Sequence, residues 1–180
     1  MGTVVLIRHT SVDVPAGTIY GQTDVLPDRT FAAEAEKLKS EVRPFTGFSV
    51  FSSPLTRCRM LAEALFPGRE IHFDQRITEL DFGNWESRRW EEIEQLEEGR
   101  YWFDRYQTVR CPGGEGYPDL YSRVRDFLIC YRKEFAGGAV IITHGGPFRV
   151  LAGLLKGMSA EGVWDLPAPP YGGLELFELE

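Results

Sequence analysis

The sequence predicts an α/β protein in which helices cover both faces of a mostly parallel sheet. Two continuous apolar runs, Val4 to Ile7 and Ala139 to Thr143, have the composition of strands that are buried on both faces. Strand-like and amphipathic segments alternate along the chain, an order that favours a three-layer α/β/α sandwich. A single domain over residues 1–180 is expected, because a chain of this length can bury about 70% of its surface in one core.

Five short segments have the pattern of strands. They are residues 3–7, 48–51, 71–73, 139–143 and 174–179. The last one alternates apolar and acidic residues from Leu174 to Leu179, which predicts a strand with one solvated face. The first is expected to lie inside the sheet, because it is apolar throughout.

Helices are predicted between these strands. Their expected ranges are residues 31–42, 54–66, 88–106, 119–135 and 148–155. Thr30 is expected to be the N-cap of the first helix, and Ser53, followed by Pro54, the N-cap of the second. Gly157 is expected to end the last one.

The charge and the cysteines narrow the function classes. The chain has 20 Lys and Arg against 27 Asp and Glu, and this net charge of -7 disfavours nucleic-acid binding, which needs a basic surface. Three widely spaced cysteines without a C-x-x-C pair indicate neither a disulfide framework nor a zinc site. The apolar run at residues 4–7 is too short for a membrane span or a signal peptide. We therefore expect a cytoplasmic protein with reduced thiols.

Two of the three histidines occupy equivalent positions in the predicted fold. His9 and His144 each directly follow a buried strand, at the edge of an open α/β sheet where ligands bind. His72 lies inside a strand without a motif around it and is interpreted as structural. The pair His9 and His144 is therefore the candidate centre of a functional site.

Two arginines accompany these histidines. Arg8 precedes His9, and Arg57 lies near the start of the second predicted helix. A guanidinium group binds phosphate through two hydrogen bonds and stays charged without a metal. Two arginines and two histidines can thus neutralise a phosphoryl group, so a small phosphorylated substrate is expected.

Other phosphatase chemistries lack their motifs in this sequence. A cysteine phosphatase needs an arginine six residues after its cysteine, but Ala64, Tyr117 and Ala136 stand there. An Asp-x-Asp loop after the first strand and a Walker lysine motif are both absent. Three scattered histidines disfavour a metal-dependent phosphatase. We therefore expect no metal and no cofactor.

Five blocks in this order resemble the histidine phosphatases of the phosphoglycerate mutase superfamily. They are Arg8-His9-Thr10, Ser53 to Cys58, Glu79 to Glu86, Gly113-Gly114-Glu115 and Thr143 to Gly146. Together they span nearly the whole chain. The resemblance implies a phosphoglycerate mutase-like fold and a phosphomonoesterase activity.

The resemblance also implies roles for the histidines and arginines. His9 would attack phosphorus and form a phosphohistidine, provided that its other ring nitrogen donates to an acceptor that fixes the tautomer. Arg8, Arg57 and His144 would hold the phosphoryl oxygens, with His144 as a charged clamp.

The resemblance also implies a role in proton transfer for one of the acidic residues. The resemblance implies that Glu79 protonates the leaving oxygen and then activates water, and Asp81 is the competing candidate. Glu86 and Glu115 are more typical of solvated loop or cap residues, although Glu115 could support the pocket.

The first loop departs from the pattern of the relatives. Residues 10–15 replace a stretch that in most relatives leads to an asparagine in contact with phosphate. Ser11, Thr23 or the backbone N–H of Gly145 could supply that contact, and the sequence does not choose between them.

The blocks at residues 20–24, 79–86 and 113–117 are most similar to α-ribazole phosphatases. This resemblance implies removal of the 5′-phosphate of an α-ribazole nucleotide during assembly of the cobalamin lower ligand. Five aromatic residues could stack on its benzimidazole base or pack in the core: Trp85, Trp90, Tyr101, Trp102 and Tyr106. The alternatives are a phosphatase of sugar phosphates or other small phosphomonoesters, and an inactive phosphate-binding protein. A monomer or a homodimer is expected.

Overall fold

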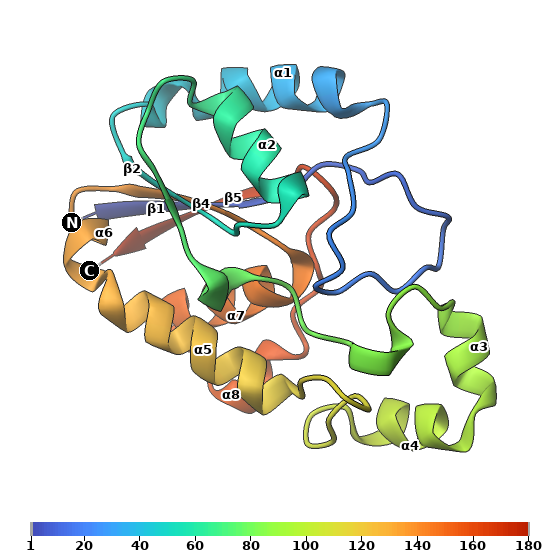
Figure 1. Cartoon of the computed structure of the whole chain (residues 1–180). Coiled ribbons are helices and arrows are strands. Elements are labelled where there is room, and N and C mark those ends of the chain that lie inside the picture. The colour runs from blue at the N-terminus through green and yellow to red at the C-terminus, as the bar shows by residue number, and fades with distance from the viewer. Residues whose placement is uncertain (1, 180) are drawn as a thin grey trace.

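A five-stranded sheet forms the centre of the computed structural model, which describes residues 2–179 (Figure 1). The strands are β1 (Gly2–Arg8), β2 (Ser49–Ser52), β3 (Ile71–Phe73), β4 (Ala139–Thr143) and β5 (Leu174–Leu179). Their order is β3-β2-β4-β1-β5, with the first four parallel and β5 antiparallel to β1. The prediction of a mostly parallel sheet with β1 inside it is confirmed.

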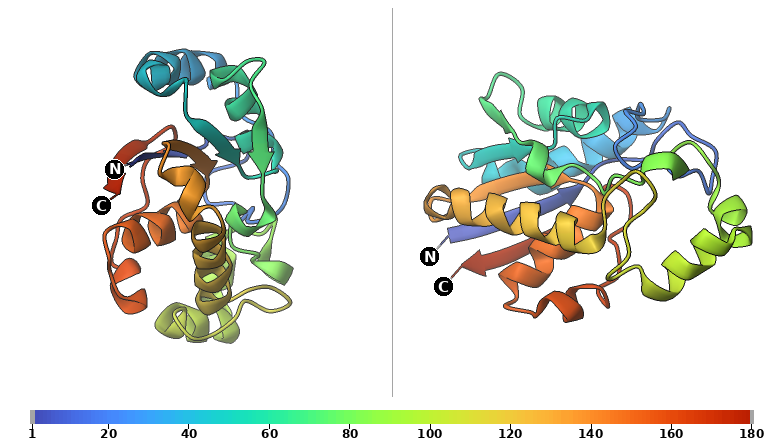
Figure 2. Two further views of the ribbon diagram at one scale, coloured as in Figure 1. Left: turned by 90° about the vertical axis from the view of Figure 1, so that its left-hand side faces the viewer. Right: turned by 60° about the horizontal axis from the view of Figure 1, so that its bottom comes forward.

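Helices cover both faces of this sheet, as the two further views show (Figure 2). One face carries α1 (Phe31–Val42) and α2 (Thr56–Leu65), and the other carries α5 (Tyr117–Cys130), α6 (Arg132–Phe135), α7 (Gly145–Leu155) and α8 (Ala160–Val163). The short helices α3 (Trp90–Gln95) and α4 (Glu97–Arg105) lie at the end of the molecule where the parallel strands terminate (Figure 1). Within residues 2–179, no helix has the length and apolar character needed to cross a membrane.

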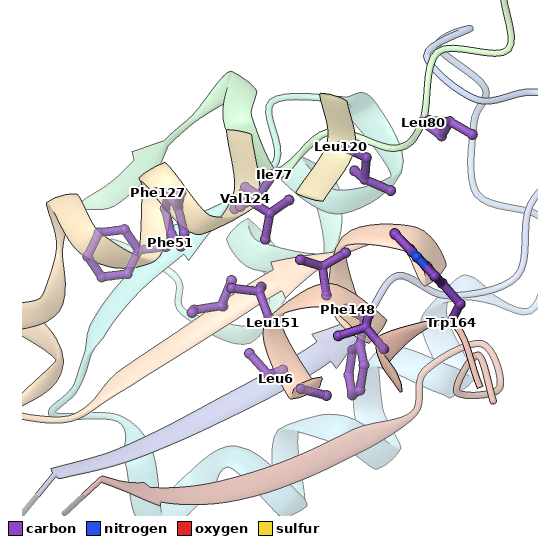
Figure 3. Packing of buried hydrophobic residues seen from close by; sticks show 14 of the residues in the cluster. Leu6, Phe51, Ile77, Leu80, Leu120, Val124, Phe127, Phe148, Leu151 and Trp164 are labelled. Atoms are coloured by element: carbon purple, nitrogen blue, oxygen red, sulfur yellow. The ribbon is translucent and has the colours of Figure 1, made fainter. Parts of the chain in front are cut away.

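The alternation of strand side chains divides the core into two clusters. Val4 and Leu6 of β1 point toward the α5 and α7 face, while Val5 and Ile7 point toward α1 and α2, and all four are fully buried. Figure 3 shows the first cluster, in which Leu6 lies near Leu151 and Phe148 of α7. Because burial of one such side chain stabilises the fold by about 1.5–3 kcal/mol, β1 is anchored on both faces.

The start of α2 differs from the prediction. The helix begins at Thr56, and Ser53 is not its N-cap. Instead, the carboxylate of Asp24 accepts hydrogen bonds from the backbone N–H and the hydroxyl of Thr56, each at 2.7 Å. The cap thus comes from a distant loop, and Ser53 is free for another role. Thr30 occupies the N-cap position of α1 as predicted, but its hydroxyl binds Asp28 and Glu34 and makes no capping bond.

Two predicted helices are interrupted and one is longer than expected. Leu96 has extended backbone angles and separates α3 from α4, and Tyr131 separates α5 from α6. The helix predicted from residue 148 begins at Gly145, because Pro147 falls in the first turn, where its missing N–H costs little. His144 therefore occupies the N-cap position of α7.

Candidate active site

The pairing of β1 with β4 brings the two histidines together. Arg8 is opposite Thr143 in the parallel register, and the ladder continues with the N–H of His9 donating to the carbonyl of Thr143 at 3.0 Å. Side chains that follow paired parallel strands emerge at the same edge of the sheet. The ring centroids of His9 and His144 are accordingly 5.2 Å apart.

The ring of His9 is oriented by its neighbour in sequence. Its Nδ1 lies 2.8 Å from the carbonyl oxygen of Thr10, and because a carbonyl only accepts, Nδ1 carries the hydrogen. Burial, together with the positive charges of Arg57 and Arg8, holds the pKa of His9 well below its usual value. The imidazole is therefore neutral, with a lone pair on Nε2.

His144 is held in the opposite tautomer. Its Nδ1 accepts from Nε of Arg57 at 3.2 Å, so Nε2 carries the hydrogen and donates to the hydroxyl of Ser53 at 2.7 Å. Burial and the charge of Arg57 lower the pKa of His144 well below its usual value. His144 is thus uncharged in this environment, and the predicted charged clamp requires a bound anion that raises its pKa.

Arg57 contributes a fully buried positive charge. Its terminal nitrogens donate to the carbonyls of Gly21 at 2.6 Å and Thr23 at 3.0 Å. Among the described residues, none of the ion pairs involves Arg57. A buried charge without a counterion is costly, so the site has a strong preference for an anion.

Arg8 and the start of α7 complete the positive side of the site. One terminal nitrogen of Arg8 donates to the carbonyl of Pro169 at 2.6 Å, whereas its Nε is buried without a partner. Gly145 packs directly against this guanidinium, since a Cβ there would lie 3.5 Å from Cζ of Arg8. A helix N-terminus and an unpaired guanidinium N–H together suit an anionic ligand. Within residues 2–179, no group of three or more His, Cys, Asp or Glu side chains is arranged to hold a metal ion.

The carboxylate of Glu79 lies at the first turn of α7, and the carboxylate of Asp81 does not. Both carboxylate oxygens of Glu79 lie 3.2 Å from the N–H of Gly146, and one also accepts from the N–H of Leu80 at 2.9 Å. Asp81 instead accepts from the N–H of Gly83 at 2.8 Å and stabilises a turn. Of the two candidate acids, Glu79 alone belongs to the lining of the cavity that Arg8 also lines.

The backbone of Glu79 is fixed by an ion pair that the sequence did not reveal. Arg123 of α5 donates to the carbonyl of Glu79 at 2.8 Å and to that of Thr78 at 2.7 Å. Glu115 pairs with Arg123 at 2.8 Å and also accepts from the N–H of Asp81 at 3.1 Å. Glu115 therefore supports the pocket, as the sequence suggested.

The interpretation of Glu86 as a solvated loop or cap residue is wrong. Its carboxylate accepts from the N–H groups of Gln22 at 2.8 Å, Thr23 at 2.6 Å and Phe82 at 3.1 Å, and also from the hydroxyl of Thr23. These bonds fix the segment whose carbonyls hold Arg57. The only sequence signal for this role is that Glu86 lies in one of the blocks that carried the resemblance.

The three candidates for the unassigned phosphate contact differ in position. The hydroxyl of Thr23 is directed to Glu86, and Thr23 supports Arg57 through its carbonyl. Ser11 lines the cavity, and its N–H donates to Glu34 at 3.1 Å. Gly145 lies against Arg8. The geometry therefore favours Gly145 and Ser11 over Thr23.

A cavity of about 580 Å³ is separated from His9 by Tyr171, which lines the cavity and packs against the His9 ring. Arg8, Glu79, Tyr20 and Tyr171 are at its functional end, and Asp28 is the other ionisable residue in its lining. Apolar residues make up much of the rest: Val12, Val14, Pro15, Ala16, Ile19, Phe82 and Trp90. A second cavity of about 650 Å³ lies between the ends of α5 and α7 and the β1–β5 edge, far from these catalytic candidates.

The aromatic residues after Glu79 serve mainly the core. Trp85 is 1% exposed and Trp102 is 7% exposed, and their rings pack edge to face. Trp90 is the member of the predicted group that lines the cavity, where Phe82 packs against it. Tyr101 is exposed on α4, outside the cavity lining.

The chain is similar in sequence to known phosphatases and mutases. A family model described as the histidine phosphatase superfamily (branch 1) matches residues 4–180. Phosphoserine phosphatase 1 of Hydrogenobacter thermophilus is 28% identical over 170 residues, which cover 91% of this chain and 81% of that protein. A probable phosphoglycerate mutase of Salmonella paratyphi C is 29% identical over 163 residues, with coverage of 87% and 76%.

Solved structures share the fold. The crystal structure of a putative alpha-ribazole-5′-P phosphatase from Escherichia coli has a TM-score of 0.88 and 24% identity, covering 97% of this chain and 89% of that one. A mycobacterial glucosyl-3-phosphoglycerate phosphatase has a TM-score of 0.85 and 21% identity, with the same coverage of both chains. The phosphoglycerate mutase-like fold predicted from the sequence is confirmed.

The lowered pKa values of His9 and His144 predict how stability depends on pH. Below about pH 6.5 the unfolded chain takes up protons on both histidines while the folded chain does not, so the free energy of unfolding should fall as pH decreases. The expected slope is at most about 1.4 kcal/mol per pH unit for each histidine. Urea denaturation at about pH 7 and about pH 5 measures it.

Two variants isolate this contribution. His144→Asn should show a smaller pH dependence than the wild type, because one of the two buried histidines is gone. His72→Asn, which changes an exposed histidine, should keep the full dependence. Equal pH dependence in His144→Asn and the wild type would contradict the assignment.

Proposed function

Because the chain belongs to the histidine phosphatase superfamily (branch 1), we propose that it is a phosphomonoesterase that forms a phosphohistidine on His9. One observation carries this proposal. The hydrogen bond from Nδ1 of His9 to the carbonyl of Thr10 leaves the lone pair of Nε2 available to attack phosphorus. The buried guanidinium group of Arg57 and the half-buried one of Arg8 favour a phosphate ester over a neutral substrate.

In the first half-reaction, Nε2 of His9 attacks phosphorus in line with the leaving oxygen. The N–P bond forms as the P–O bond to the alcohol breaks. Arg8, Arg57 and the N–H of Gly145 stabilise the phosphoryl oxygens, and a dianionic phosphoryl group raises the pKa of His144 so that its positive charge adds to theirs. These groups provide the necessary positive charge, and we propose that no metal ion takes part.

Glu79 provides the proton transfers. It gives a proton to the leaving alkoxide and, now ionised, accepts a proton from the water that attacks the phosphohistidine. The N–P bond then breaks, phosphate leaves, and both His9 and Glu79 return to their starting states. The position of Glu79 at the wall of the cavity supports this role, whereas Asp81 is committed to a turn.

For the substrate, we propose the 5′-phosphate of an α-ribazole nucleotide, dephosphorylated during cobalamin lower-ligand assembly. The proposal is supported by similarity to α-ribazole phosphatases and by the character of the cavity. Trp90 and Phe82 offer flat apolar surface to a benzimidazole base. Arg8 is the single cation in the described lining, so an uncharged leaving group fits better than a second anionic group.

Two alternatives stay distinct from this proposal. A phosphatase of sugar phosphates or other small phosphomonoesters would use the same phosphoryl site with a different part of the cavity. A phosphoglycerate is disfavoured, because the described lining contains Asp28 and no cation beyond Arg8 for a second anionic group. An inactive phosphate-binding protein of the same fold would retain the anion site without turnover.

Replacement of the nucleophile should abolish turnover. We expect His9→Ala to release no phosphate from a phosphomonoester, while wild-type activity continues unchanged in the presence of a chelator. Acid-labile phosphate trapped on the wild-type protein by rapid quenching would mark the phosphohistidine. Wild-type rates in His9→Ala would refute the mechanism, and a wild-type protein without activity on any ester would favour the inactive alternative.

The proton donor can be tested with carboxylate variants. Glu79→Gln should lower kcat by about 10²–10⁴-fold, with a much smaller effect on inhibition by phosphate. Gly146→Ala should also lower kcat, because its Cβ would overlap the carboxylate of Glu79 and displace it. Asp81→Asn is the control, and a loss in kcat as large as that of Glu79→Gln would transfer the acid role to Asp81.

A panel of esters tests the substrate. We expect kcat/KM for α-ribazole phosphate to exceed that for simple sugar phosphates, phosphoserine and phosphoglycerate. Trp90→Ala should reduce this preference, because it removes a flat wall of the cavity. Equal kcat/KM for α-ribazole phosphate and sugar phosphates would refute the narrow proposal and leave the phosphatase intact.

A further inference from the structure

Two tyrosines cover the positive side of the site, one over each arginine. Tyr20 lies in the loop after β1, and its ring centroid is 5.1 Å from Cζ of Arg57. Tyr171 precedes β5, and its ring centroid is 4.2 Å from Cζ of Arg8. Both tyrosines line the cavity that contains Glu79. Neither residue belongs to the mechanism described above.

Tyr171 also covers the nucleophile. Its ring centroid is 5.5 Å from that of His9, and His9 is only 1% exposed. The chain beside Tyr171 is held to that of His9, since the N–H of Gly172 donates to the carbonyl of His9 at 3.0 Å. Gly172 has a φ of 65°, a conformation that glycine adopts without strain. A phosphoryl group must therefore pass Tyr171 to reach His9.

The hydroxyl groups of the two tyrosines bind each other, with their oxygens 2.6 Å apart. This bond connects loops that are 151 residues apart in sequence. The pair has two hydroxyl hydrogens and uses one of them in the mutual bond, so one hydrogen remains available for another acceptor. Burial and the bond to Tyr171 raise the pKa of Tyr20 above its usual value, so this phenol stays protonated as a donor.

We propose that the phosphoryl group of the substrate enters between Tyr20 and Tyr171, replaces their mutual hydrogen bond and accepts a hydrogen bond from each hydroxyl. The exchange is favourable because a hydroxyl binds an anionic oxygen more strongly than it binds a neutral hydroxyl. The arginines already under the two rings bring the anion to this position. The two hydroxyls thereby add phosphate contacts to those of Arg8, Arg57 and the N–H of Gly145.

This inference rests on the proposed function, because it takes the space beside His9 as the phosphoryl site. It adds two binding residues that act on the phosphoryl group and not on the alcohol. Their contribution should therefore be the same for every substrate, and it should also appear in the binding of inorganic phosphate alone.

Titration calorimetry with inorganic phosphate tests the inference on Tyr20→Phe and Tyr171→Phe. Each variant keeps the ring over its arginine and loses one hydroxyl. We expect the Kd for phosphate to rise by about 10-fold in each variant, because the variant loses a hydrogen bond to a charged group but no longer has to break the weaker bond between the two hydroxyls. Turnover should show an equal fold-loss of kcat/KM on α-ribazole phosphate and on a sugar phosphate. Tyr101→Phe, on α4 and outside the cavity, is the control and should bind phosphate like the wild type.

Two results for the Phe variants would overturn the inference. Phosphate affinity that is unchanged or increased in either Phe variant would overturn the inference, since the hydroxyl bond would then only hold the two loops closed. A loss of kcat/KM that depends on the alcohol would overturn it as well. Failure of the proposed function is distinguishable, because it would appear in the wild type as an absence of phosphate release. Thermal unfolding of each variant verifies that it is folded.

Discussion

Arg57 carries a positive charge that is completely removed from solvent, and much of the site is arranged around this charge. Two backbone carbonyls and the ring of His144 accept its hydrogen bonds, but none of them cancels the charge. Burial and this positive charge together lower the pKa of His9 and of His144 and keep both neutral, and the uncompensated charge favours an anionic ligand. A phosphoryl dianion would compensate the guanidinium groups and the unpaired N–H of Arg8 together.

Such a charge has to be held by rigid partners, and the chain provides them from distant segments. The carboxylate of Glu86 binds three backbone N–H groups and so fixes the segment from Gly21 to Thr23, whose carbonyls face Arg57. The pair Glu115–Arg123 does the same for the backbone of Glu79. Positioning of this kind favours catalysis, because small displacements of reacting groups reduce the rate strongly.

Much of the fold could be predicted because its signals are local. The apolar strands, the glycine after α7 and the alternation of strands with helices each depend on short stretches of sequence. The start of α7 differs because Pro147 is tolerated in its first turn, and the start of α2 differs because its first turn depends on a remote group. Asp24 caps α2 from another loop, and Ser53 binds His144 instead of capping that helix.

Some residues of the candidate site could likewise be predicted from local sequence, and others could not. His9, His144, Arg8, Arg57 and Glu79 could be predicted because each residue type has a chemistry and a place in a short motif. Glu86 and Arg123 could not, since an isolated acidic or basic residue on a loop or helix is usually solvated. Their roles come from backbone groups that lie 44 to 64 residues away in sequence. The contact between Tyr20 and Tyr171 could not be predicted either, since the two residues are 151 positions apart in sequence.

The sequence by itself determined the α/β architecture, the family resemblance and the identity of the residues that we propose bind and attack a phosphoryl group. Tertiary structure decided the state in which those residues are held. The register of β1 with β4 sets the distance between the histidines, burial beside Arg57 makes both of them neutral, and the loops cover His9 with Tyr171. Distance, desolvation and hydrogen-bond partners are properties of segments brought together in space, which no local pattern of residues contains.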